Sequence, residues 1–206
     1  MGTCPECDMG FDPEEPANVR FHTKYHDRVV NGIIAPQKKA DQIIWEEGLF
    51  RVSAVNSLSP FPLRFRAEVV GSCAHTDNTC KSYDFGPFAA EGMSLEKDTH
   101  AFLLHKHNRV IGIVTAQKAK HVWKCTWEQY ENHQFEKLVG YPPMWGIAFA
   151  WIHRRYRGQG LTRRVIVEVA AFFATNVEFL GWQTPFTPSA KKMIKRLCPT
   201  CFYIAK

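Results

Sequence analysis

Short apolar runs separated by polar turns dominate the pattern along the first half of this chain. Residues 29–35 and 42–55 are apolar runs on either side of a polar, lysine-containing turn, which predicts short strands. Residues 100–104 and 110–115 are also apolar and flank a polar stretch, and this arrangement predicts a β-hairpin. The first half should therefore contain mostly antiparallel strands.

The second half of the chain alternates strands with helices. Residues 144–153 form an apolar run, which predicts a buried strand. Residues 161–175 place apolar side chains at helical spacing, which predicts an amphipathic helix. These side chains are Leu161, Val165, Val169 and Phe172. Two further short strands are predicted at 179–182 and 201–205, with a basic helix at 189–197 between them.

The segment between the first strands and the hairpin carries weaker signals. Residues 64–73 predict a helix that faces the core through Phe65, Val69 and Val70. Residues 74–97 are rich in Asp, Ser, Thr, Gly and Pro, which predicts a long loop bordering a site. With antiparallel strands first and strand-helix units last, the predicted fold class is α+β or mixed α/β.

The amino-acid composition indicates which classes of protein the chain can belong to. Hydrophobic residues make up 45% and charged residues 22% of the 206 residues, which is typical of a globular chain. The net charge of +6 favours an anionic partner such as a nucleic acid, an acidic protein face or cofactor phosphates. No apolar run approaches the roughly 20 residues that span a bilayer, and no secretory signal opens the chain. We therefore expect an intracellular protein without a membrane partner, nuclear if the source is eukaryotic.

A metal site is predicted at the N-terminus. Cys4, Cys7, His22 and His26 have the spacing C-x2-C-x14-H-x3-H, which supplies two ligands from a turn and two from one helix face. Four protein ligands leave no open position, so one structural Zn(II) is expected. Because one finger reads only about three base pairs, docking to protein is favoured over weak contact with DNA or chromatin. The seven cysteines fit thiols and metal better than a disulfide framework.

An anion-binding turn is predicted between the strand at 144–153 and the helix at 161–175. The residues from Arg155 to Leu161 carry the pattern R-x-x-G-x-G, and glycines there let backbone N–H groups approach a pyrophosphate. A dinucleotide-binding turn is a rival, but Arg163 stands where its third glycine belongs. A merely structural arginine-rich turn is the other alternative.

The chain resembles the establishment-of-cohesion (ESCO-type) N-acetyltransferases of the GNAT superfamily, and the resemblance covers nearly its whole length. The segments that carry it are CPECDMGFDPEE, RFHTKYH, GIIAPQKKADQIIWEEGLFRV, HAFLLHKHNRVIGIVTAQ, WGIAFAWIHRRYRGQGLTRRVI and TPSAKKMIKRLC. The resemblance implies a zinc finger at 1–28 and a GNAT domain at 29–206, with a central, mostly antiparallel sheet flanked by helices. It also implies transfer of acetyl from acetyl-CoA to lysines of a cohesin-like protein.

The resemblance further implies where acetyl-CoA binds. The backbone of one strand would hold the pantetheine arm, and the following turn would wrap the pyrophosphate. The cofactor-binding residues implied in this way are Ala150, Trp151, Ile152, Arg157, Gly158, Gln159, Gly160, Leu161, Thr162 and Arg163. For the Trp151 side chain itself, core packing is the favoured role.

The chain departs from the family at its polar positions. The family's serine, helix glutamate, aspartate and tyrosine fall at Ala148, Val167, Thr184-Pro185 and Leu197. Glu168 is one residue beyond the expected glutamate, and within the apolar stripe of its helix. Because burial raises a carboxyl pKa toward the range of a general base, we predict Glu168 as the catalytic base. An ion pair with a neighbouring Arg or Lys is the alternative.

Two other functions stay open at this point. The missing polar groups favour a zinc-finger scaffold that binds acyl-CoA but catalyses weakly. A small-amine acetyltransferase is the third reading. Poorer candidates for site residues are His153, which follows the cofactor strand, and Cys198 with Cys201, which form a second CxxC without further ligands.

Overall fold

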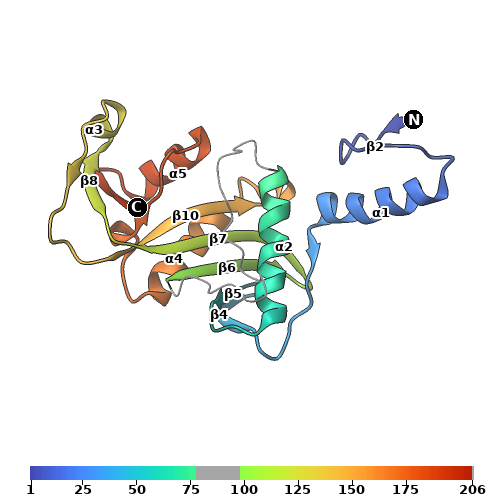
Figure 1. Cartoon of the computed structure of the whole chain (residues 1–206), viewed down its shortest axis with the longest axis horizontal. Coiled ribbons are helices and arrows are strands. Elements are labelled where there is room, and N and C mark those ends of the chain that lie inside the picture. The colour runs from blue at the N-terminus through green and yellow to red at the C-terminus, as the bar shows by residue number, and fades with distance from the viewer. Residues whose placement is uncertain (78–97, 206) are drawn as a thin grey trace.

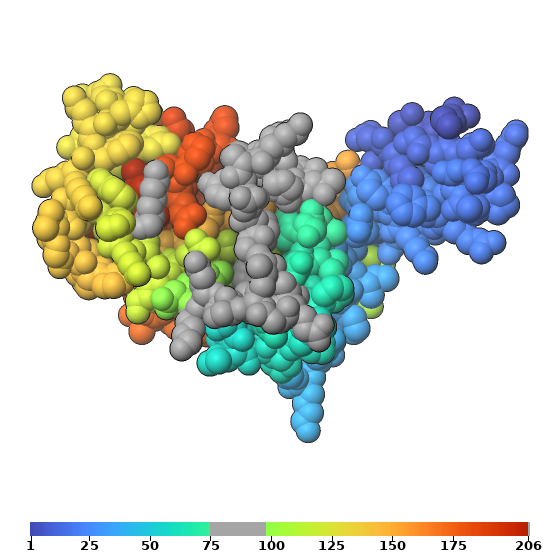
Figure 2. All heavy atoms as spheres, in the orientation of Figure 1, coloured from blue at the N-terminus to red at the C-terminus, as the bar shows by residue number. Residues whose placement is uncertain are grey.

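The computed structural model describes residues 1–77 and 98–205 and contains one large mixed sheet with a small N-terminal finger beside it. In Figure 1 the finger lies at one end of the molecule, and α2 and α4 lie on opposite sides of the sheet. Figure 2 shows the finger as a lobe next to the rest of the chain. None of the helices in these described ranges is long and apolar enough to cross a membrane.

The finger contains two short strands and one helix. Strands β1 (Gly2–Thr3) and β2 (Gly10–Phe11) pair antiparallel, and α1 (Pro16–Asn31) follows. The predicted strand at 29–35 is wrong in its first half, because α1 continues to Asn31 and only β3 (Ile33–Ile34) is extended. Gly32 ends the helix with a φ of 91°, which favours glycine. The helix therefore runs past the predicted domain boundary at residue 28.

The main sheet has the order β4-β5-β6-β7-β10-β11-β12-β8-β9, and β3 pairs with β7. Its strands are β4 (Gln42–Glu47), β5 (Phe50–Asn56), β6 (Thr99–Lys106), β7 (Arg109–Ala119), β8 (Val122–Thr126), β9 (Glu136–Lys137), β10 (Met144–Ile152), β11 (Gly181–Trp182) and β12 (Cys201–Ala205). Among the described strands, only the β10–β11 and β11–β12 pairs are parallel. The predicted hairpin and the strands at 42–55, 144–153 and 201–205 are confirmed.

Helices cover both faces of the sheet. They are α2 (Phe61–Asp77), α3 (Trp127–Glu131), α4 (Leu161–Phe172) and α5 (Pro188–Leu197), with 3-10 turns η1 (Arg154–Tyr156) and η2 (Val177–Phe179). Val52 and Ala54 of β5 pack in the cluster that contains α4, whereas Val55 packs in the cluster that contains α2. Because both faces are buried, central strands are apolar throughout rather than alternating.

The predicted helix at 64–73 is confirmed, and of the side chains predicted to face the core, Val70 is buried but Phe65 is not. Leu63, Ala67, Val70 and Ala74 are buried, whereas Phe65 is 53% exposed. The predicted loop at 74–97 lies mostly outside the described residues, and helix α2 includes its first residues. The predicted strand at 179–182 is shorter than expected, because η2 takes its first residue and β11 its last two.

Candidate cofactor site and metal centre

The four predicted metal ligands lie together in the finger. Cys4 Sγ is 3.3 Å from His26 Nδ1, and Cys7 Sγ is 3.5 Å from His22 Nε2. All four ligand atoms lie within 4.8 Å of one another. In a tetrahedral site with normal zinc–sulfur and zinc–nitrogen bond lengths, sulfur and nitrogen ligands are about 3.5 Å apart. The donor set and its spacing therefore fit one structural Zn(II).

Neighbouring groups prepare these ligands for a metal. Hydrogen bonding from the backbone of Glu6 lowers the pKa of the Cys4 thiol to about 6, which favours the thiolate that zinc binds. His26 Nε2 lies 3.1 Å from the carboxylate of Glu6, so this nitrogen donates while Nδ1 faces the metal. Phe11 stacks on His22 with ring centroids 3.9 Å apart. These contacts fix both imidazole rings.

The C-terminal end of α1 is bound to the main sheet by an arginine of β7. Arg109 donates to both carboxylate oxygens of Asp27 at 3.0 Å and to the carbonyl of Gly32 at 2.8 Å. The Arg109 side chain, followed by the amide of Asn31, lowers the pKa of Asp27. The finger therefore has a fixed attachment to the sheet rather than a free linker.

Among the described residues, no strand pairs with one edge of β10 beside the turn that follows it, and this edge is called the free edge. Its register against β7 shifts between Ile147 and Phe149, and β11 pairs with it only at Gly146 and Ile147. Beyond this bulge the two parallel strands are no longer paired. The splayed edge leaves backbone groups available to a ligand.

The free groups of β10 can be assigned from the strand's alternation. The N–H of His153 donates to the carbonyl of Ile111 on β7, at 2.8 Å. Because bonding alternates along a strand, Trp151 also faces β7, whereas Ala150 and Ile152 present their backbone groups to the open edge. The carbonyl of Ile152 accepts from Arg157 Nε at 2.9 Å, in agreement with this assignment. Trp151 is 6% exposed and packs in the core under α2, as favoured from the sequence.

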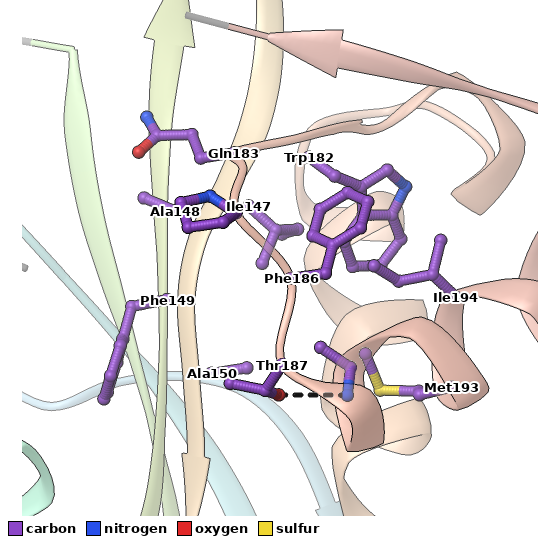
Figure 3. Close-up of a pocket in the computed structure, with 12 residues that line it drawn as sticks. Ile147, Ala148, Phe149, Ala150, Trp182, Gln183, Phe186, Thr187, Met193 and Ile194 are labelled. Atoms are coloured by element: carbon purple, nitrogen blue, oxygen red, sulfur yellow. Dashed lines mark hydrogen bonds between the residues drawn. The ribbon is translucent and has the colours of Figure 1, made fainter. Parts of the chain in front are cut away.

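A small, largely apolar cavity of ≈ 80 Å³ lies where β10 and β11 part. Figure 3 shows Ala148 and Ala150 on one side of it and Trp182, Phe186, Met193 and Ile194 on the other. Thr187 caps α5 there by accepting from the N–H of Ala190 at 3.2 Å. The contributions of α5 and of residues 182–187 were not predicted, although the Pro188-initiated amphipathic helix was a usable signal.

The predicted anion-binding turn joins this strand to α4. Gly158 and Gly160 have φ values of 78° and 76°, a region that favours glycine. Gly160 is the N-cap of α4, and no side chain in the described ranges caps the helix there. The first N–H groups of a helix have no partner within it, and with the helix dipole they favour an anion. This end of α4 can bind a phosphate.

The arginines near the turn do not all surround it. Arg154 contacts the backbone carbonyl of Glu6, and Arg155 donates to Asn31, so both point toward the finger. Arg164 binds Glu47 and stacks over Trp45 at 4.7 Å. Arg163, by contrast, is exposed at the start of α4. These arginines therefore lie on three different surfaces rather than together around the turn.

Glu168 lies on the side of α4 that faces β4. Its side chain is 17% exposed and lies 3.1 Å from Arg164 Nε, and Arg164 also contacts Glu47 at 3.0 Å. The cavity is lined by β10, β11 and α5, and Glu168 is not among its lining residues. The structure thus shows the ion pair that the sequence left as an alternative, and the base role of Glu168 stays a prediction.

The departures from the family pattern fall at different places. Ala148 and Pro185 both line the cavity. Val167 is 38% exposed on α4, and Leu197 packs against the core.

The second CxxC, at Cys198 and Cys201, does not form a metal site with other ligands in the described ranges. Cys198 is buried, and among the described residues the finger holds the only Cys/His/Asp/Glu group arranged for a metal.

Comparisons with known proteins agree on one kind of fold. No family model matches the sequence. The chain is 23% identical over 219 residues to the N-acetyltransferase ECO1 of Candida glabrata, which covers 94% of this chain and 82% of that protein. The structure of the xEco2 acetyltransferase domain bound to a lysine–CoA conjugate has a TM-score of 0.62 and 17% identity. The match covers 82% of this chain and 98% of that one. The same domain reported without the conjugate gives a TM-score of 0.62 and 16% identity.

Proposed function

We propose that this chain, an ESCO-like protein with the GNAT acetyltransferase fold, is an N-acetyltransferase that transfers acetyl from acetyl-CoA to lysine ε-amines of a protein. The observation that carries the proposal is the free edge of β10, which has a cavity at one end and a glycine turn at the other. A ligand with an extended arm attached to a diphosphate fits this arrangement.

The chain's own backbone supplies most of the proposed binding. Ala150 would pair with the pantetheine arm as an added strand does, and Ile152 would contribute its N–H, because Arg157 already binds its carbonyl. The N–H groups at Gly158–Arg163 would hold the pyrophosphate at the start of α4. When bound, acetyl-CoA supplies the thioester that donates the acetyl group. The sequence-predicted set, residues 150–152 and 157–163, is therefore kept as the proposed cofactor site.

Orientation and exclusion of water are what the cavity can contribute to transfer. Its lining of Ile147, Phe149 and Phe186 is apolar and would keep water from the acyl group. The acceptor ammonium must lose a proton before its nitrogen attacks. Because the described lining residues include no carboxylate, we propose that a chain of water molecules carries this proton to Glu168, the predicted base.

The proposed acceptor is a lysine on a protein, and the resemblance implies a cohesin-type protein in the nucleus. The finger would hold one structural zinc and support the catalytic body. We propose that residues 1–28 form the zinc finger and residues 29–206 the GNAT-like domain. The helix of the finger continues past this boundary to Asn31. The name of the Candida glabrata relative supports N-acetyl transfer, while the particular acceptor rests on the resemblance.

Acetylation by the zinc-loaded protein tests this function. The purified chain is incubated with acetyl-CoA and, in separate reactions, with the proteins of a lysate from the source organism or with small amines. Mass spectrometry identifies the acetylated products. We expect acetylated protein lysines in excess over acetylated small amines. Preference for small amines would instead identify a small-amine acetyltransferase. Saturable CoA binding without any transfer would identify a scaffold, and either result would overturn the proposal.

A further inference from the structure

The segment between β10 and the glycine turn is bound to the zinc finger. His153 is only 3% exposed, and its Nε2 lies 2.6 Å from the carbonyl of Val29 on α1. Its Nδ1 lies 3.3 Å from the N–H of Arg155. Since a carbonyl can only accept and an N–H can only donate, Nε2 carries the proton. The imidazole thus connects the finger's helix to the first residues of the turn.

Two arginines make the next contacts with the finger. Arg155 Nη1 donates to Asn31 Oδ1 at 3.0 Å. Arg154 donates to the backbone carbonyl of Glu6 and lies 3.9 Å from the carboxylate of Asp8. Glu6 lies between the two predicted cysteine ligands, in the loop at residues 4–7 (the metal loop). This contact therefore exists only while the metal loop keeps its conformation. Three consecutive residues therefore bind the finger at both its helix and its metal loop.

The turn that these residues precede is short. Gly158 is only three positions beyond Arg155, and both turn glycines are exposed, with open space where a Cβ would be. Exposed turns with few buried contacts open at little cost in free energy, so contacts at their ends stabilise one conformation. One end of the turn is fixed by α4, and the other by His153, Arg154 and Arg155.

We propose that His153, Arg154 and Arg155 are positioning residues through which the folded zinc finger holds the CoA turn, so that zinc and CoA bind with positive linkage. This inference rests on the proposed function, which assigns the pyrophosphate to that turn. Small zinc fingers unfold without their metal. Loss of zinc then removes the finger's contacts with the turn, and CoA must order the turn on binding.

Linkage has a consequence that separates it from simple structural support. If zinc raises the affinity for CoA by some factor, CoA must raise the affinity for zinc by the same factor. Couplings between sites typically change affinities by roughly 5- to 150-fold. The test is a chelator competition that measures the zinc affinity of the full chain with and without saturating CoA.

We expect saturating CoA to tighten zinc binding by about tenfold, within that range. S-acetylpantetheine, which lacks the pyrophosphate, should leave zinc affinity unchanged, since the linkage runs through the pyrophosphate turn. Unchanged zinc affinity in a chain that binds CoA saturably would overturn the inference and leave the proposed function intact. Failure of the zinc-loaded chain to bind CoA would overturn both.

Variants locate the linkage in these residues. His153→Phe removes the hydrogen bond to Val29 and should lose most of the linkage. His153→Gln keeps an N–H donor at a similar distance and should retain the linkage. Asn31→Ala should weaken the linkage from the finger's side. Arg20→Ala, an exposed change on the same helix, is the matched control. Circular dichroism and zinc content verify that each variant is folded and loaded, and equal linkage in all four would contradict the assignment.

Discussion

Replacing Gly160 with alanine tests the geometry of the CoA turn. Gly160 has a φ of 76°, and a Cβ added there meets no atom within 4 Å. The substitution therefore introduces backbone strain without a clash. A residue with a Cβ in the left-handed region costs about 1–2 kcal/mol. If CoA needs this conformation, its affinity falls by roughly 5- to 30-fold, since 1.4 kcal/mol is a factor of ten.

The chain offers a matched control for this variant. Gly140 has a φ of 73° and equally open surroundings, and it lies in the loop before β10. Gly140→Ala introduces the same strain far from the turn. Calorimetric titration with CoA should show weaker binding for Gly160→Ala alone, because its free turn relaxes and CoA must restore the strained conformation, while thermal unfolding verifies that both variants stay folded. Equal CoA affinity in the two variants would refute the assignment of the pyrophosphate to this turn.

Three other predictions follow from charged groups. Asp41→Asn leaves Arg66 without its buried ion-pair partner, and chemical unfolding should show a loss of about 3–5 kcal/mol. Burial opposes ionisation of Asp41, but hydrogen bonds from Arg66 and Lys38 lower its pKa overall. This stabilisation is therefore complete above the unfolded value of about 3.9 and lost as pH falls through the lower folded pKa, which acid unfolding measures. Glu168→Gln should lower turnover by about 10²- to 10⁴-fold at unchanged CoA affinity, because it removes the predicted base. Unchanged turnover would show that Glu168 serves only its ion pair with Arg164.

Local signals made the metal ligands and the turn predictable from sequence. The ligand spacing of the finger depends on a turn and a helix face within the finger itself. The glycines of the anion-binding turn depend on the backbone conformation at their own positions. Neither requires knowledge of distant contacts. The strand at 144–153 was predictable for a similar reason, because most residues on both of its faces are buried and its apolar run is continuous.

Features that depend on tertiary contacts were not predictable. Val29 and Val30 are β-branched and favour a strand, yet Val30 is buried with the finger's cysteines as part of α1. The direction of Glu168 depends on Arg164 and β4, which the helical periodicity alone does not place. Likewise, His153 is buried because α1 docks against it, a contact across 124 positions of sequence.

Calorimetric titration of the zinc-loaded chain with CoA tests the proposed function most directly. The free edge of β10 and the amides at Gly158–Arg163 predict saturable binding of one CoA per chain, with S-acetylpantetheine binding more weakly because it lacks the pyrophosphate. The absence of saturable heat from a folded chain with full zinc content would contradict the assignment of this site to acetyl-CoA.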